Sequence, residues 1–358
     1  MPLKNLKLIS AGAGSGKTYR LTQEMTDLLT SGAARPSGII ATTFTKRAAA
    51  ELKERVRVSL LRKGMTAEAN ELKNALIGTV HGLGVKLLKR FAFEAGVSPQ
   101  VDIIADEDHQ RLFNLSMAAV IKVKTIEEIE ELCDKLGLSL DGEKFNWRKE
   151  VLRVVDIIRG NNFDHAAIAK SKRKSWEELA KILPPVNDKI TDKSFSSRLK
   201  IALSETIAAL EGNEDIDATK VTATGKSTLK RLLSQLNRKG YLPWYELCKL
   251  ANFKAKGVGA KSRELVDAVV EIGQLHPTLP AFQNDLHRYQ DLIFDSAEAA
   301  IAEYDKYKKN RGRIDYTDME VLVLGLLDNP AVQKTLRLHI RPCPRSSAGT
   351  SPSSPSHP

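Results

Sequence analysis

The chain has 358 residues, of which 42% are hydrophobic and 28% are charged, and its formal net charge at pH 7 is +11. This composition is typical of a globular protein of about two domains, and it excludes disordered, collagen-like and membrane-spanning chains. Residues 1–105 carry 16 Lys and Arg against 8 Asp and Glu, so the first third of the chain holds most of the net positive charge. Such a surplus favours an anionic partner such as nucleic acid, and a solvated lysine-rich surface is the alternative.

Short apolar runs alternate with amphipathic stretches in the first third of the chain. We expect strands at Leu6–Ser10, Gly38–Thr43, Ala75–Thr79 and Val101–Ala105, and helices at about Gly16–Thr30, at Lys46–Arg62 and from Thr79 to about Phe91. Strands that alternate with helices predict a parallel sheet covered by helices on both faces.

Helical periodicity dominates from Asp106 to about Lys309, where apolar residues recur every three or four positions. This pattern predicts a helical domain of about 200 residues. Further on, Asp315 is expected to cap a helix, with Asp318 in its first turn. Residues 341–358 contain five prolines and six serines and cannot form a packed element.

The strongest chemical signal is the octapeptide AGAGSGKT, which follows an apolar run and opens a predicted helix. This is the setting of a phosphate-binding loop, in which glycines let backbone N–H groups face a phosphate and the helix N-terminus adds a positive dipole. Lys17 is expected to reach the β- and γ-phosphates, and the Thr18 hydroxyl to bind Mg²⁺. A glycine-rich turn without a ligand is the alternative. The predicted nucleotide-binding residues are Ala11, Gly12, Ala13, Gly14, Ser15, Gly16, Lys17 and Thr18.

Two further strands are expected to end at the same edge of the sheet, where parallel sheets bind their ligands. One of them ends in Thr43 and Phe44, and the other ends in Thr79 and His81. Hydroxyls there can hold a phosphate, and an aromatic ring can stack on a base. The alternatives are a core position for Phe44 and a structural hydrogen bond for His81.

The string TGKS at Thr224–Ser227 resembles the end of a phosphate-binding loop. It lies in helical surroundings, and Lys220 stands where the first glycine would be. We interpret it as a loop or a helix start.

In chain order, SAGAGSGKT, ATTFTKRAAAELKERV and GTVHGLGVKLLKRF resemble motifs I, Ia and Ib of superfamily 1 DNA helicases of the UvrD type. The later segment RIDYTDMEVLVLGLL resembles the LDFxD segment that precedes the Walker B strand. The resemblance covers about residues 6–95 and 311–340. The long helical stretch between them is similar in position to an inserted subdomain. Its size is closer to that of the exonuclease V beta-chain (RecB-like) helicase–nucleases than to that of UvrD and Rep.

This resemblance implies an α/β fold of the P-loop NTPase (RecA-like) class, a parallel sheet with a large all-α inserted subdomain. It implies an incomplete ATP-binding motor domain at 1–105 and 300–340, the inserted subdomain at 106–299 and a disordered tail at 341–358. ATP and Mg²⁺ are the implied cofactors, with Lys17 and Thr18 as catalytic residues and Thr18 as the metal ligand.

The resemblance also implies contacts with single-stranded DNA from Thr43, Phe44, Thr79 and His81, in DNA repair or recombination. Single-stranded or duplex DNA and other helicase–nuclease subunits are the implied partners. This sequence departs from the family at Lys46 and Arg47, where Asn-Lys is usual, and at Gly82, where serine is usual. The glutamine motif that reads adenine is not evident.

The Pro- and Ser-rich tail begins where the family continues into its Walker B strand, so we expect a gene fragment or a frameshifted product. A chain completed in trans by another polypeptide is the third alternative. Such a chain is expected to bind nucleotide and DNA and to hydrolyse ATP slowly if at all. The competing functions are a non-catalytic DNA- or nucleotide-binding module and another P-loop enzyme, such as a small-molecule kinase.

The cysteine content and the hydropathy of the chain predict its cellular compartment. The three cysteines, Cys133, Cys248 and Cys343, are far apart and lack zinc-ligand spacing, which predicts a reducing compartment. Apolar runs are too short for a signal peptide or a membrane helix. We therefore expect a cytoplasmic protein without membrane association.

Overall fold

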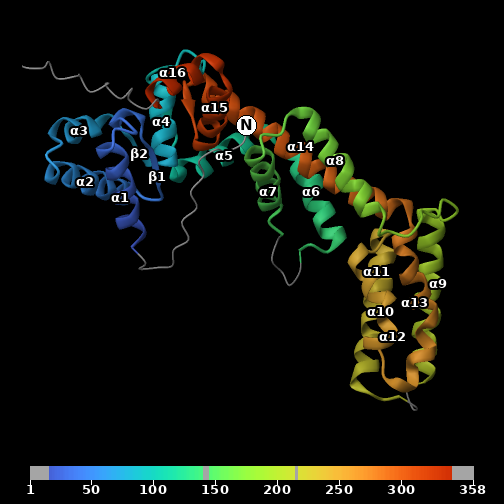
Figure 1. Cartoon of the computed structure of the whole chain (residues 1–358). Helices are drawn as coiled ribbons and strands as arrows, with labels where there is room; N and C mark the ends of the chain where they lie inside the picture. Colours follow the sequence, from blue (N-terminus) through green and yellow to red (C-terminus); the bar gives the residue numbers. More distant parts are fainter. Residues whose placement is uncertain (1–15, 140–144, 214–216, 341–358) are drawn as a thin grey trace, which may run out of the picture. The chain divides into compact units, whose positions relative to one another are not determined.

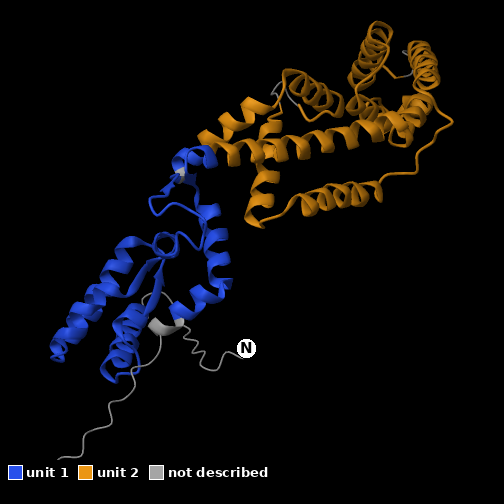
Figure 2. Ribbon diagram, turned by 90° about the horizontal axis from the view of Figure 1, so that it is seen from above, with its two compact units in different colours: residues 1–109, 308–358 blue, residues 110–307 orange. Residues whose placement is uncertain are grey.

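The computed structural model describes residues 16–139, 145–213 and 217–340 (Figure 1). The chain divides into two compact units (Figure 2). Unit 1 comprises residues 1–109 and 308–358, and unit 2 comprises residues 110–307. The predicted strand at Leu6–Ser10 and most of the predicted phosphate-binding loop lie outside the described residues.

Unit 1 combines helices with short parallel strands. Its strands are β1 (Ile40–Thr43), β2 (Leu76–Thr79), β3 (Asp102–Ile103) and β4 (Arg313–Ile314). Its helices are α1 (Lys17–Thr30), η1 (Pro36–Gly38), α2 (Lys46–Arg62), α3 (Thr66–Glu71), η2 (Leu72–Asn74), α4 (Val80–Arg90), α15 (Tyr316–Asp328) and α16 (Pro330–Ile340). The boundary between the units falls within α5 (Asp106–Val120) and α14 (Pro280–Asn310).

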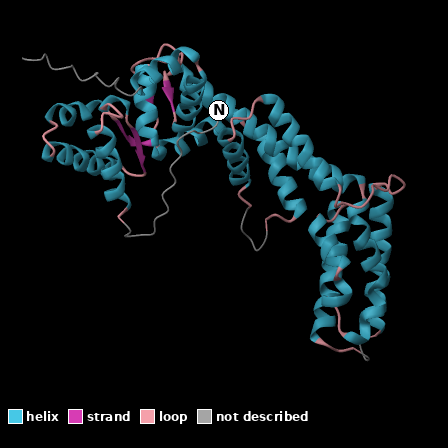
Figure 3. Ribbon diagram, viewed as in Figure 1, coloured by secondary structure: helices cyan, strands magenta, loops and turns pink. Residues whose placement is uncertain are grey.

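The described strands form two small parallel sheets. β1 pairs with β2, with Thr43 opposite Thr79. β3 pairs with β4, with Ile103 opposite Ile314. One continuous sheet was expected from the sequence, and the described part of the chain instead has two separate pairs (Figure 3). The second pair is short because β4 is immediately followed by Asp315, which caps α15 and ends the strand.

Helices α1 and α2 pack together beside the first sheet. Met25 and Leu29 of α1 share a buried cluster with Leu52, Val56 and Leu60 of α2. These positions recur at three- and four-residue spacing, so each helix presents one apolar stripe to the other. The same cluster includes Ile77 of β2, and it therefore fixes both helices against that strand.

A second buried cluster joins α4 to the C-terminal helices. It contains Leu88 of α4, Met319 and Leu326 of α15, and Val332 of α16. Gly84 permits the close approach of α4 and α15, because a Cβ there would lie 2.8 Å from the Met319 sulfur. This packing brings the start of α15 beside the start of α4.

Unit 2 is helical throughout its described residues (Figure 3). Its further helices are α6 (Val123–Leu136), α7 (Trp147–Gly160), α8 (His165–Ala180), α9 (Asp192–Gly212), α10 (Lys220–Lys239), α11 (Trp244–Ala251), α12 (Phe253–Lys256), η3 (Ala260–Val266), α13 (Asp267–Leu275) and η4 (His276–Thr278). A large buried cluster joins α9, α10, α11 and α13, with Leu203, Leu229, Leu247 and Val269 among its members. No helix in the described part of the chain combines the length and the apolar character needed to cross a membrane.

Candidate nucleotide and DNA site

The first turn of α1 carries the described end of the predicted phosphate-binding loop. Gly16, immediately before α1, has a left-handed backbone conformation with φ 75° and ψ 24°. Glycine adopts this conformation at little cost, and it leaves the helix without a side-chain cap. Lys17 and Thr18 follow, and both are exposed. The positive dipole at the N-terminus of a helix makes this end suitable for an anion. Residues 11–15 lie outside the described part of the chain.

The register of β1 and β2 brings two of the predicted DNA-contact segments together. Thr43 lies opposite Thr79, and both strands end there. The Thr43 hydroxyl donates to the carbonyl of Thr45 at 3.0 Å, and the Thr45 hydroxyl accepts from the amide of Ala48 at the start of α2. Thr79 caps α4 in the same way, accepting from the Gly82 amide at 3.1 Å. Each threonine therefore shapes the turn that leads from a strand into a helix.

Phe44 is fully exposed at the end of β1. The alternative that this ring belongs to the core is therefore wrong. An exposed ring contributes no burial to the fold, and its face is open to stacking with a planar ligand.

His81 is held by two residues of α15. Its Nε2 lies 3.3 Å from an oxygen of Glu320, and its ring centroid lies 4.6 Å from that of Tyr316. The imidazole is about half exposed. Tyr316 and Glu320 are four residues apart and share one face of α15. Sequence reasoning missed both residues, because only the packing of α4 on α15 brings them to His81.

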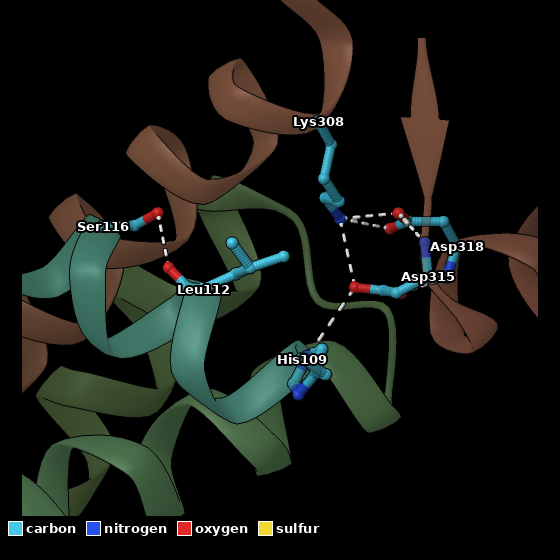
Figure 4. A network of polar contacts seen from close by, with 6 residues as sticks. All are labelled: His109, Leu112, Ser116, Lys308, Asp315 and Asp318. Atoms are coloured by element: carbon cyan, nitrogen blue, oxygen red, sulfur yellow. Dashed lines mark hydrogen bonds and ion pairs between the residues drawn. The ribbon is translucent and has the colours of Figure 1, made fainter. Parts of the chain in front are cut away.

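A buried charged network holds the start of α15 (Figure 4). The Lys308 ammonium group donates to both carboxylate oxygens of Asp318, at 2.6 and 2.7 Å, and to Asp315 at 3.4 Å. His109 Nε2 lies 3.6 Å from the same oxygen of Asp315. Asp315 and Asp318 also accept from each other's amides, which forms a capping box. The predicted cap at Asp315 is confirmed, and the network anchors the first turn of α15, which contains Tyr316.

The helices that follow the loop and the strands share a charge pattern in their first turns. α1, α2 and α4 have no acidic residue there, and α1 and α2 begin with Lys17, Lys46 and Arg47. A cation near a helix N-terminus is unfavourable, because it adds to the positive end of the dipole. A bound anion would reverse this effect. The arrangement is therefore suited to binding phosphate groups.

The TGKS string at Thr224–Ser227 forms part of α10 in unit 2. Its hydroxyls donate to helix carbonyls one turn earlier, as in the bond from Thr224 to Lys220 at 2.9 Å. A helical backbone cannot turn its amides around a phosphate, so this string is not a second phosphate-binding loop. Within the described residues, no group of three or more His, Cys, Asp or Glu side chains could hold a metal ion.

Similarity to known proteins identifies the family of this chain. The profile of the UvrD/REP helicase N-terminal domain matches residues 2–342. An ATP-dependent helicase/nuclease subunit from Streptococcus suis is 37% identical over 278 residues, which cover 70% of this chain and 22% of that protein. A protein of the same name from Lactobacillus acidophilus is 25% identical over 89% of this chain and 30% of its own length. The exonuclease/helicase subunit RexA of Streptococcus pneumoniae is 23% identical over 92% of this chain and 30% of its own length.

The chain thus spans less than a third of the length of these curated relatives. The resemblance to UvrD-type helicases that the motifs indicated is confirmed, because the matched region covers nearly the whole sequence. The chain belongs to the family of the UvrD/REP helicase N-terminal domain, and its fold is that of a P-loop NTPase.

Proposed function

We propose that this chain is the ATP-binding part of an ATP-dependent DNA helicase. It binds Mg·ATP at the N-terminus of α1 and single-stranded DNA across the ends of β1 and β2. Family membership and the names of the relatives support this proposal. The observation that carries it is the exposed Phe44 ring beside the paired ends of the two strands, Thr43 and Thr79.

In the nucleotide site, Lys17 contacts the β- and γ-phosphates and the Thr18 hydroxyl binds Mg²⁺. Gly16 supports this assignment, because its left-handed conformation turns the chain into α1 without a side-chain cap. Residues 11–15 complete the cradle in this proposal. ATP supplies the free energy for stepping along DNA, and the described residues bind and orient its phosphates.

In the DNA site, Phe44 stacks on a base, and Thr43 and Thr79 approach the phosphate backbone. His81 donates a hydrogen bond to the strand from a position set by Glu320 and Tyr316. Stacking on an aromatic ring is largely independent of base identity, which suits an enzyme that moves along any sequence.

The two units have separate roles in this proposal. Unit 1 is a RecA-like motor domain, and the helical unit 2 is a subdomain inserted between β3 and β4. Since the relatives are named as subunits of helicase/nucleases, we propose that further subunits of such an assembly are partners in the cytoplasm.

The test is a titration of fluorescently labelled oligothymidine with the full chain and with Phe44→Ala. Loss of one base–aromatic stack costs about 1–3 kcal/mol, so the Kd is expected to rise about 5- to 150-fold. Phe93→Ala is the matched control, because Phe93 is 87% exposed and lies away from the strand ends, after α4. Equal losses in the two variants would contradict the DNA site.

A further inference from the structure

Unit 2 contains a groove that the proposed helicase function does not use. It has a volume of about 820 Å³ and lies between α10 on one side and α11 and α12 on the other. Its α10 wall runs from Lys220 to Leu232, which is about 18 Å of helix or about three turns. A wall of this length can lie along about three turns of a helical segment.

The floor of the groove is apolar. Leu232, Leu250 and Phe253 belong to the core of unit 2 and reach the groove from below, and Val221 lines it while 49% exposed. Such a floor offers pockets for leucine or phenylalanine side chains of an occupant.

The walls of the groove are held together by contacts near both ends, and between these ends the backbone of α10 at Gly225 packs against the Gly257 carbonyl. At one end, the Thr222 hydroxyl accepts from the amide of Gly259 at 2.8 Å and donates to Asp217 at 2.9 Å. At the other end, Arg231 of α10 donates to Glu246 of α11 at 3.0 Å. Both walls are therefore fixed before any partner binds, which lowers the entropic cost of binding.

The rim is strongly basic. Lys220, Arg231, Lys249 and Lys256 line the groove, and Glu246 is the carboxylate among its lining residues. Glu246 is 4% exposed and is neutralised by Arg231 at 3.0 Å, with the Lys249 ammonium group 4.0 Å away. The lining residues thus have three more cations than anions, and the positive charge faces an occupant.

We propose that this groove binds an acidic amphipathic helix of a partner protein. Its apolar face fills the floor at Val221 and Phe253, and its carboxylates pair with Lys220, Lys249 and Lys256. Duplex DNA matches the rim charge but has no apolar ridge to fill the floor, because nucleic-acid interfaces are predominantly polar. The combination of an apolar floor and a basic rim therefore selects an acidic peptide over a phosphate backbone.

The probe is a fluorescein-labelled helical peptide with leucine or phenylalanine at positions i, i+3, i+4 and i+7 and glutamate elsewhere. Binding to the full chain is measured by anisotropy, with a scrambled peptide of the same composition as the peptide control. The variant is Lys220→Glu combined with Lys256→Glu, which reverses two rim charges and is expected to raise the Kd roughly tenfold.

Lys193→Glu is the control for the substitution at Lys220. Lys193 is exposed in the first turn of α9, as Lys220 is in the first turn of α10, but it does not line the groove. A glutamate at Lys193 or Lys220 is favourable to its helix dipole. Lys256 is exposed at the last residue of α12, where a glutamate costs about 0.3–1 kcal/mol through the dipole. Lys193→Glu is expected to bind the peptide as the unaltered chain does.

Cys248 provides a second readout, because it is exposed and lines the groove. In a Cys343→Ser background, the bound peptide should slow its reaction with a maleimide. Cys133 does not interfere, since it is buried and burial raises the pKa of its thiol to about 11. Three results would overturn the proposal: no preference for the amphipathic peptide, equal binding by the double variant and the control, or better protection of Cys248 by a short DNA duplex.

Discussion

Lys308 should stabilise the start of α15 more than any exposed lysine near it. Lys308 is 4% exposed, and Asp315, one of its two partners, is 2% exposed. Removing one partner of a buried ion pair costs about 3–5 kcal/mol, because the other charge is left without compensation. In Lys308→Ala, Asp315 keeps its hydrogen bond from the Asp318 amide, and Asp318 is exposed enough to be rehydrated. We therefore expect a loss near the lower limit, about 3 kcal/mol.

The assay is hydrogen exchange of the amides of α15. All three tryptophans, Trp147, Trp176 and Trp244, lie in unit 2, so their fluorescence does not report on unit 1. A loss of about 3 kcal/mol should speed exchange in α15 about a hundredfold. The control is Lys309→Ala, at the exposed neighbouring position. Equal exchange rates in the two variants would refute the role of the buried network.

Two further predictions concern unit 2, which tryptophan fluorescence does report. In urea titrations, Gly225→Ala should lower the free energy of unfolding of unit 2 by at least about 1–3 kcal/mol. The reason is that a Cβ at this position would lie 1.9 Å from the Gly257 carbonyl oxygen. Gly160→Ala, whose Cβ would meet no atom within 4 Å, should cost nothing. Burial lowers the pKa of His276, which donates to the Gly273 carbonyl, so the folded state binds its proton less readily than the unfolded chain. Unit 2 should therefore be most stable above about pH 6.5 and lose stability as the pH falls below that value. The urea midpoint of His276→Gln should fall less than that of the unaltered chain over the same pH range. Equal falls in the two midpoints would contradict this prediction.

Local signals in the sequence located several elements well. The helix predicted at Lys46–Arg62 has those bounds in the structure, and Thr45 caps it. The cap at Asp315 was also predicted correctly. These features depend on residues within one helical turn of each other, so the sequence alone determines them.

Features that depend on distant residues could not be predicted. His81 contacts Tyr316 and Glu320, more than 200 residues away along the chain, and no local pattern joins them. The pairing of β3 with β4 could not be predicted for the same reason, because all the residues of unit 2 separate the two strands along the chain. The exposure of Phe44 could not be predicted for another reason. A strand-to-helix junction is compatible with a buried ring and with an exposed ring, and the packing around it determines which of the two occurs.

Nucleotide binding at the start of α1 can be measured with a fluorescent ATP analogue in the presence of Mg²⁺. We expect the full chain to bind the analogue and Lys17→Ala to weaken binding roughly tenfold or more, the size expected for loss of charge-assisted hydrogen bonds. Arg20→Ala, one turn further along α1 and paired with Glu24, is the control and should bind normally. Equal affinities of the unaltered chain and Lys17→Ala would show that the start of α1 is not a nucleotide site.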